Sequence, residues 1–339
     1  MSDGFEGQLL DKSKWWDGQI LASQYSIAAP GRCGLHAIKV TVADGITSDA
    51  CDAECQRAEI RVASGHWPLY GDVSWYSFSF RVDGDLPTTG SDRTVIGQWK
   101  APTDNSPFVA QRFDNSVFHI TIQDADTRIL VAKAEGDPGR VRLFEALVSS
   151  LSRNSLPAVE ALEAIQAMWL LAKSAPAVLR PLELPDAALE SLVSRLGVPP
   201  GLRDQLSARA IVGLIGEFSF LADIALYMGP SSATVERNEG ATLPDPRKGW
   251  TDMKYRIRGG RQDNQWPPQQ EGQLDVWANG NLVATVRGNL SYKSKSDSVG
   301  QGQYFKFGIY RKLIPGAINL YFDEFHQGSS EQQVKMSCP

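Results

Sequence analysis

Three short segments place charged, amide and phenolic side chains at alternate positions, the spacing that puts them on one face of a β-strand. The segments read RAEIR at 57–61, GQWK at 97–100 and YFKFGIYR at 304–311. In the third segment the intervening positions hold the apolar residues Phe305, Phe307 and Ile309, which we expect to pack into a core. The opposite, polar faces would then carry Arg57, Glu59, Arg61, Gln98, Lys100, Tyr304, Lys306 and Tyr310.

A fourth segment, VFHITIQ at 117–123, places His119, Thr121 and Gln123 opposite apolar neighbours. Strict alternation in TVIGQWK groups Ile96 with the polar positions and Val95 with the core. If these strands belong to one sheet, their polar faces line a groove rich in Arg, Lys and Tyr. Arg binds carboxylates in a bidentate manner and Lys supplies a point charge, so such a groove suits an extended polyanion. Any one of these faces taken alone is better explained as an ordinary solvated surface, whereas the four together favour a groove.

Two stretches of the chain have the period-two pattern of antiparallel strands, from the start to about residue 133 and again after about residue 250. Asn279-Gly280 lies between two such runs and predicts a two-residue hairpin turn. From 139 to 229 apolar residues instead recur every three or four positions, which predicts four or five helices. We therefore predict a mainly β sandwich in two parts, 1–135 and 231–339, interrupted by a large α-helical insertion at 136–230.

The order of the three segments resembles the signature of jelly-roll alginate lyases, Arg-x-Glu-x-Arg, then Gln-x-His, then Tyr-Phe-Lys-x-Gly-x-Tyr. The second half, from GWTDMKYRIRG to INLYFDEFHQG, is similar to heparin lyase I-like polysaccharide lyases, a related jelly-roll group that includes glucuronan lyases. The resemblance covers roughly 1–135 and 245–328. It implies a concanavalin-like β-jelly-roll and β-elimination on a uronic-acid polysaccharide, such as alginate, glucuronan or a heparin-type chain.

The resemblance also implies roles for individual residues. Tyr310 matches the family's catalytic tyrosine and would act as both the acid and the base. Lys306 belongs to a cationic neighbourhood that would favour the phenolate form of Tyr310. Arg57 or Arg61, together with Gln98, would neutralise the uronate carboxylate and stabilise the enolate-like charge that develops. Substrate binding is assigned to Glu59, Arg61, Tyr304, Arg311 and Arg112.

One position departs from the pattern, because Lys100 stands where the relatives carry histidine. Three explanations remain open at this point. Tyr310 serves as both base and acid, or His119 supplies the missing imidazole. Alternatively, the chain has lost its activity and is a non-catalytic protein that binds acidic carbohydrate on the same fold.

Other classes are disfavoured by what the chain lacks. The net charge of −5 argues against a general nucleic-acid binder. No apolar run is long enough to span a membrane, and the first residues lack the pattern of a signal peptide. The paired carboxylates of a sandwich glycoside hydrolase, spaced as Glu-x-Asp-x-x-Glu, do not occur. We expect a monomeric, secreted or periplasmic protein whose partner is an acidic polysaccharide.

No cofactor is expected for the chemistry. Because many related sandwiches hold a calcium ion between an acidic residue near the N-terminus and one on the last strand, the resemblance suggests a structural Ca²⁺ at Glu6 and Asp323. Two unrelated surface carboxylates are the alternative. The four cysteines allow a small Cys51–Cys55 loop and a Cys33–Cys338 bridge between the chain ends, or four free thiols.

Overall fold

The computed structural model divides the chain into two compact units, one formed by Met1–Pro138 with Pro230–Pro339 and the other by Gly139–Gly229. The second unit lies outside the residues that the structure describes, and so does the helical insertion predicted at 136–230, apart from Gly136. The described residues all belong to the first unit and are 1–44, 55–69, 71–86, 93–102, 106–114, 116–124, 127–136, 231, 233–260, 271–290, 302–335 and 338.

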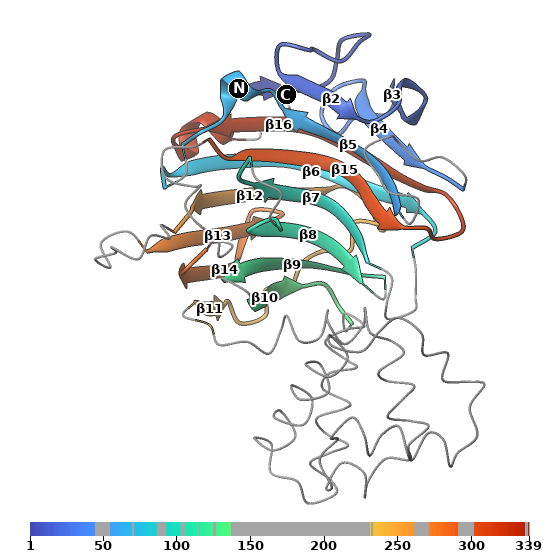
Figure 1. Ribbon diagram of the computed structural model, residues 1–339. Coiled ribbons are helices and arrows are strands. Elements are labelled where there is room, and N and C mark those ends of the chain that lie inside the picture. The colour runs from blue at the N-terminus through green and yellow to red at the C-terminus, as the bar shows by residue number, and fades with distance from the viewer. Residues whose placement is uncertain are drawn as a thin grey trace, which may run out of the picture. The chain divides into compact units, whose positions relative to one another are not determined.

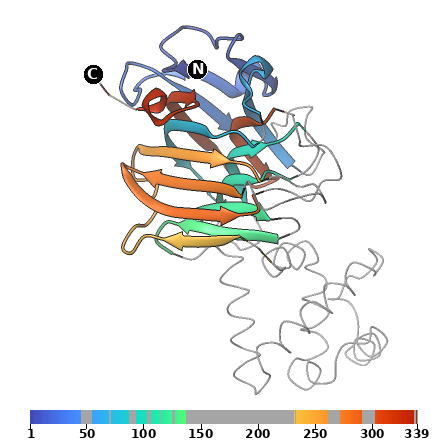
Figure 2. The same cartoon turned by 90° about the vertical axis from the view of Figure 1, so that its left-hand side faces the viewer.

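Two antiparallel sheets lie face to face in this unit (Figures 1 and 2). The larger sheet runs in the order β11 (Thr234–Arg237), β14 (Asn281–Gly288), β13 (Gly272–Ala278), β12 (Thr251–Arg258), β6 (Ser74–Gly84), β16 (Ile318–Gly328), β4 (Ala37–Val42) and β3 (Tyr25–Ala28), and β1 (Ser2–Asp3) also pairs with β16. The seven-stranded sheet runs β10 (Thr127–Lys133), β9 (Val117–Asp124), β8 (Val109–Asp114), β7 (Thr94–Lys100), β15 (Tyr304–Lys312), β5 (Cys55–Val62) and β2 (Trp15–Gln19). Short 3-10 turns occupy Ala22–Gln24, Ser64–His66 and Glu331–Val334.

The predicted β-sandwich is confirmed, and each of the alternating segments forms a strand. The hairpin is confirmed as well, since Ala278 pairs with Asn281 across the two-residue loop. Asn279 and Gly280 have φ angles of 48° and 84° there, the left-handed values that this turn requires. Among the described residues no helix is both long and apolar enough to cross a membrane.

Aromatic rings fill the space between the sheets and fix which face of β15 points inward. The rings of Phe307 on β15 and Phe322 on β16 stack with centroids 3.9 Å apart, and Phe305 stacks on Phe78 of β6 at 5.1 Å. Trp15 of β2 packs edge-on against Phe307 at 5.3 Å. Because neighbours on a strand point to opposite faces, this packing turns the polar residues of β15 and β2 outward.

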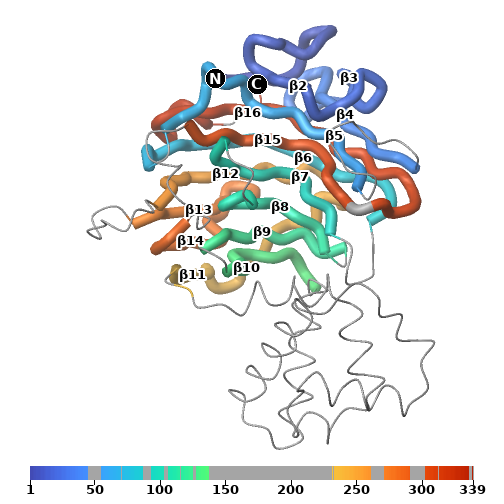
Figure 3. The backbone as a smooth tube through the Cα atoms, in the orientation of Figure 1, coloured from blue at the N-terminus to red at the C-terminus, as the bar shows by residue number. Residues whose placement is uncertain are grey.

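Strand β15 lies between β5 and β7, although it is far from both in sequence (Figure 3). Its register with β7 shifts between Phe307 and Tyr310, which marks a bulge around Gly308. A Cβ at Gly308 would lie 2.1 Å from the carbonyl oxygen of Ala58, and its φ of +135° is one that side chains rarely adopt. Glycine is therefore required here, and the bulge sets where Tyr310 lies relative to β7.

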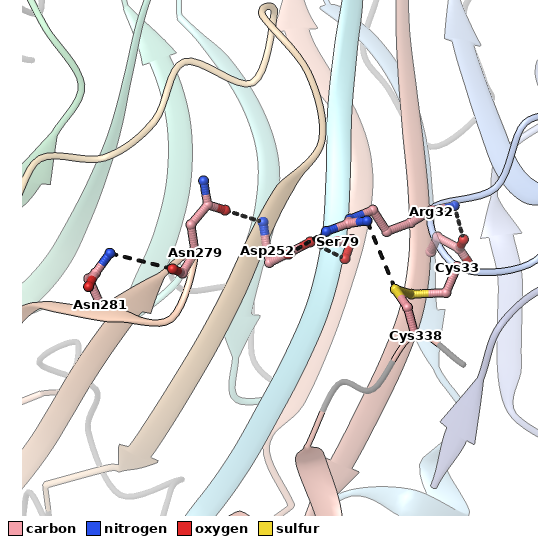
Figure 4. A network of polar contacts seen from close by, with 8 residues as sticks. Arg32, Cys33, Ser79, Asp252, Asn279, Asn281 and Cys338 are labelled. Atoms are coloured by element: carbon pink, nitrogen blue, oxygen red, sulfur yellow. Dashed lines mark hydrogen bonds and ion pairs between the residues drawn. A yellow bond between two sulfur atoms is a disulfide. The ribbon is translucent and has the colours of Figure 1, made fainter.

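A disulfide between Cys33 and Cys338 joins residues 305 positions apart (Figure 4). Beside it, Arg32 forms a bidentate pair with Asp252, its Nε and Nη2 each 3.0 Å from a carboxylate oxygen. Ser79 donates a hydrogen bond of 2.7 Å to the same carboxylate. These contacts tie the N-terminal loop and the C-terminal end to β12 and β6. Cys55 is also disulfide-bonded, and its predicted partner Cys51 lies outside the described residues.

We expect the double substitution Cys33→Ser/Cys338→Ser to lower the free energy of unfolding by about 2–4 kcal/mol, because the unfolded chain regains the freedom that this long closure removes. Urea unfolding followed by fluorescence measures the change. The single substitution Cys33→Ser should match the double one, since either breaks the same bond. Wild-type stability in the double variant would show that the Arg32–Asp252 contacts hold the chain end without the bridge.

Candidate active site

The register of three neighbouring strands brings the three signature segments together on the outer face of the seven-stranded sheet, here called the polar face. Lys306 of β15 lies directly opposite Arg61 on β5 and opposite Gln98 on β7. Tyr310 lies opposite Arg57. Because directly opposed residues in an antiparallel pair project to the same side, these side chains are neighbours on one surface.

Glu59 is the centre of the contacts on this face. One carboxylate oxygen accepts a hydrogen bond from the amide of Gln98, and the other accepts one from the ammonium of Lys306 at 2.7 Å. The second oxygen also pairs with Arg57 Nε at 3.3 Å. Lys306 donates further to Gln19 at 3.2 Å. The Glu59 side chain is only 2% exposed and its oxygens are used by protein donors, so it holds these groups in place instead of binding an acidic substrate as the sequence suggested.

Arg57 connects this centre to the phenol. Its guanidinium carbon lies 4.2 Å from the centroid of the Tyr310 ring, within the range of a cation–π contact. Tyr310 is partly exposed, and 20% of the Arg57 side chain is exposed. A continuous set of contacts therefore runs from Tyr310 through Arg57 and Glu59 to Lys306, and a positive charge lies beside the phenol.

Aromatic rings surround Arg61 at the other end of β5. Its guanidinium carbon is 4.0 Å from the ring centroid of Trp16, 5.1 Å from that of Tyr304 and 5.2 Å from that of Trp67. Burial raises the pKa of Tyr304, although the positive charge of Arg61 opposes the shift. Lys100 lies directly opposite Tyr304 on β7. Trp16 was not among the residues predicted from the sequence. Alternation in WWDGQ could have revealed it, because it places the indole of Trp15 inward and that of Trp16 outward.

His119 lies far from the phenol. Tyr310, Val95, Arg112 and His119 are in register on four successive strands, β15, β7, β8 and β9. Three strand spacings amount to about 14 Å, well beyond a hydrogen bond. His119 is 1% exposed, and its Nδ1 is 3.1 Å from the carbonyl oxygen of Val117. The geometry thus argues against His119 as a base acting with Tyr310.

Two other placements made from the sequence are corrected. Arg311 points away from the polar face, where its Nε donates to Gln56 at 2.7 Å and Nη2 to the carbonyl of Gly316 at 2.6 Å. It is 1% exposed and has no place in the site. In β7 a register shift between Val95 and Gly97 inverts the alternation, so Ile96 belongs to the core and Val95 lies beside Tyr310 and Arg112.

Glu6 and Asp323 were expected to hold calcium. Within the described ranges no group of three or more His, Cys, Asp or Glu side chains is arranged to hold a metal ion. Glu6 accepts from the backbone of His36 at 3.1 Å, and Asp323 accepts from the backbone of Arg32 at 2.6 Å. A structural calcium ion stays a prediction, and no step below uses one.

Asp323 leads to a pH prediction, because burial raises its pKa from 3.8 to about 6 and the backbone hydrogen bonds only partly oppose this. The folded state binds this proton more tightly than the unfolded state. The stability contributed by protonated Asp323 is therefore complete below about pH 4 and is lost as the pH rises through about 6. When urea unfolding is measured between pH 4 and 7, the free energy of unfolding of Asp323→Asn should rise relative to that of the wild type as the pH increases. A constant difference between the two proteins would contradict the assignment.

Comparisons with known proteins place the chain in a family. A family model described as "Polysaccharide lyase" matches residues 8–326. The alginate lyase from Klebsiella pneumoniae is a similar solved structure, with 11% identity, a TM-score of 0.44 and coverage of 97% of this chain and 100% of that one. Alginate lyase A1-II', of polysaccharide lyase family 7, has 9% identity, a TM-score of 0.39 and coverage of 91% and 84%. No curated protein matches the chain. The binding domain of botulinum neurotoxin DC matches this chain with a TM-score of 0.38, so TM-scores at this level carry no argument about function.

Proposed function

Because the chain belongs to the polysaccharide lyase family, we propose that it cleaves a uronic-acid-containing polysaccharide by β-elimination, with Tyr310 as both base and acid. The observation that carries the proposal is the Arg57 guanidinium lying 4.2 Å from the Tyr310 ring, in contact with a centre that holds Lys306 and Gln98. This arrangement puts a phenol next to cationic and amide groups suited to a carboxylate substrate.

The first task in the reaction is to make a carbon-bound proton removable. When a carboxylate is neutralised, the proton on the adjacent ring carbon becomes more acidic, because the negative charge that develops is delocalised onto the carboxylate oxygens. Arg57 and the Gln98 amide are the groups we assign to this charge. Glu59 fixes both of them in advance, so little reorganisation is needed when the charge appears.

The second task is to move the proton. The Tyr310 phenolate takes it from the ring carbon, and the electron pair of that C–H bond forms a double bond to the neighbouring carbon. The bond from that carbon to the glycosidic oxygen breaks, and the phenol returns the proton to the departing oxygen. The products are a new chain end and an unsaturated uronate. One group can serve both steps if proton and leaving group lie on the same side of the sugar ring.

The histidines support this assignment to a single residue. All four histidines of the chain lie in the described part. His36 is near Glu6 and His326 near Glu324, while His66 contacts the carbonyl of Ser13. With His119 about 14 Å from Tyr310 across the sheet, no imidazole lies beside the phenol. Lys100, which replaces the expected histidine, is opposite Tyr304 at the other end of the face.

The disulfides support a location outside the cytosol. Cys33–Cys338 and the bonded Cys55 form and persist in oxidising compartments. We therefore propose a secreted or periplasmic protein, as an enzyme acting on a polysaccharide requires access to that polymer. The specific uronate is assigned only as a class, with alginate, glucuronan and heparin-type chains as candidates.

The test is an assay of the purified chain with alginate, glucuronan and a heparin-type polysaccharide. Cleavage by elimination creates a conjugated double bond, so ultraviolet absorbance should rise with at least one of them. Hydrolysis would release reducing ends without this rise, and either that outcome or no cleavage on the panel would overturn the proposal.

A further inference from the structure

We propose that Trp16, Arg61 and Tyr304 form an outer sugar-binding subsite, which stacks one uronate ring of the polysaccharide on Trp16 and pairs its carboxylate with Arg61. This inference rests on the proposed function, and it adds a binding position remote from the reacting bond. It also predicts that the enzyme favours long chains over short ones.

The indole of Trp16 is built into the face. Strand β2 is the edge of the seven-stranded sheet, where Trp15 is 1% exposed in the core and Trp16 is 39% exposed. Trp16 lies directly opposite Arg61. A Cβ at Gly18 would come within 2.1 Å of the indole ring, so this glycine allows the ring to lie across its own strand. A large, exposed aromatic surface held in this way is suited to stacking against the apolar face of a sugar ring.

Arg61 supplies a charge that the described part of the protein does not neutralise. Arg57 and Lys306 both pair with Glu59, whereas no carboxylate in the described ranges pairs with Arg61. Its Nε is buried and finds no hydrogen-bond partner among these residues. Its guanidinium instead lies against the rings of Trp16, Tyr304 and Trp67. The Tyr304 hydroxyl also interacts with this guanidinium. The donors that Tyr304 does not use are left for a carboxylate, which favours an anionic sugar over a neutral one.

The subsite lies away from the phenol. Arg61 and Trp16 are in register with Lys306, which is four residues from Tyr310 on β15, or about 13 Å along an extended chain. Tyr304 lies two residues farther from Tyr310 on the same strand. A polysaccharide that reaches both must have several sugar residues between them. Binding energy from Trp16 is therefore available to a polymer and not to the shortest oligosaccharide that Tyr310 can cleave.

Trp16→Ala should raise KM for the polymer about tenfold, with kcat unchanged. For the shortest cleaved oligosaccharide, both constants should equal those of the wild type. Gly18→Ala should act in the same direction, because it displaces the indole, while Trp16→Phe should retain most of the affinity. Trp277→Ala is the matched control, since Trp277 stacks on Trp75 in the other sheet and is partly exposed.

Two outcomes overturn the inference. If Trp16→Ala raises KM equally for polymer and short oligosaccharide, or lowers kcat, the indole only supports the strand. If polymer KM is unchanged, the subsite does not exist.

Should the wild type cleave nothing, the proposed reaction fails by itself. Calorimetry with uncleaved polyuronate then tests the subsite separately, where weaker binding by Trp16→Ala than by Trp277→Ala supports it and equal binding removes it.

Discussion

Tyr310→Phe should lower kcat by about 10⁴-fold, because one hydroxyl removes both the base and the acid from the reaction. The phenyl ring still packs under Arg57, so the fold and the affinity for the polysaccharide should change little. Initial rates of ultraviolet absorbance give kcat, and calorimetry on the inactive variant gives the affinity. Loss of turnover with retained binding is the result that identifies a catalytic group.

The control for this substitution is Tyr321→Phe, which removes a hydroxyl from the nine-stranded sheet. Tyr321 lies on β16 against Arg81, whose guanidinium carbon is 3.9 Å from its ring centroid, so it reproduces the cation–π setting of Tyr310. It should retain wild-type activity. If Tyr310→Phe also keeps more than about a tenth of the wild-type kcat, a different group carries the proton and the assignment is wrong.

Glu59→Gln should lower the free energy of unfolding by about 3 kcal/mol, because it leaves the Lys306 ammonium buried without a negative partner. The Lys306 side chain is 5% exposed and lies 2.7 Å from the carboxylate. Activity should fall as well, since Gln98 and Arg57 lose the group that orients them. Urea unfolding measures the stability, and the absorbance assay measures the turnover.

Two further variants separate charge from packing in this prediction. Adding Lys306→Met to Glu59→Gln should recover much of the stability without recovering activity, because the buried charge is gone but the site is incomplete. Glu331→Gln breaks a more exposed pair with Lys254, whose atoms are 2.6 Å apart, and should cost no more than about 1 kcal/mol. If Glu59→Gln and Glu331→Gln lower the free energy of unfolding equally, burial does not increase the cost of breaking the ion pair at Glu59.

Some of the site follows from local sequence alone. Alternation in YFKFGIYR indicates that Phe305 and Phe307 face the core and that Lys306 and Tyr310 do not, and the structure agrees. The same argument applies to RAEIR, where Ala58 and Ile60 are fully buried. This works because strand alternation is a property of neighbouring residues and needs no knowledge of the rest of the chain.

Other features depended on contacts between distant parts of the chain. The bulge in β7 places Ile96 in the core and Val95 beside Tyr310, the reverse of what alternation predicts. No local pattern marks this bulge, because it arises from fitting β7 between β15 and β8. The same holds for Arg311, whose buried position depends on Gln56 and Gly316. Glu59 could be placed on the correct face from sequence, but its role could not, since that role is set by Gln98 and Lys306 from two other strands.

The sequence by itself therefore determined the strands, their inward and outward faces outside the bulge in β7, and the identity of the polar groups. Only the tertiary structure decided that β15 lies between β5 and β7, that Arg57 rests against Tyr310, and that Trp16 reaches Arg61. The physical reason is that side-chain direction is fixed over two residues of backbone. Strand order and register depend instead on the packing of the whole aromatic core, which joins residues hundreds of positions apart.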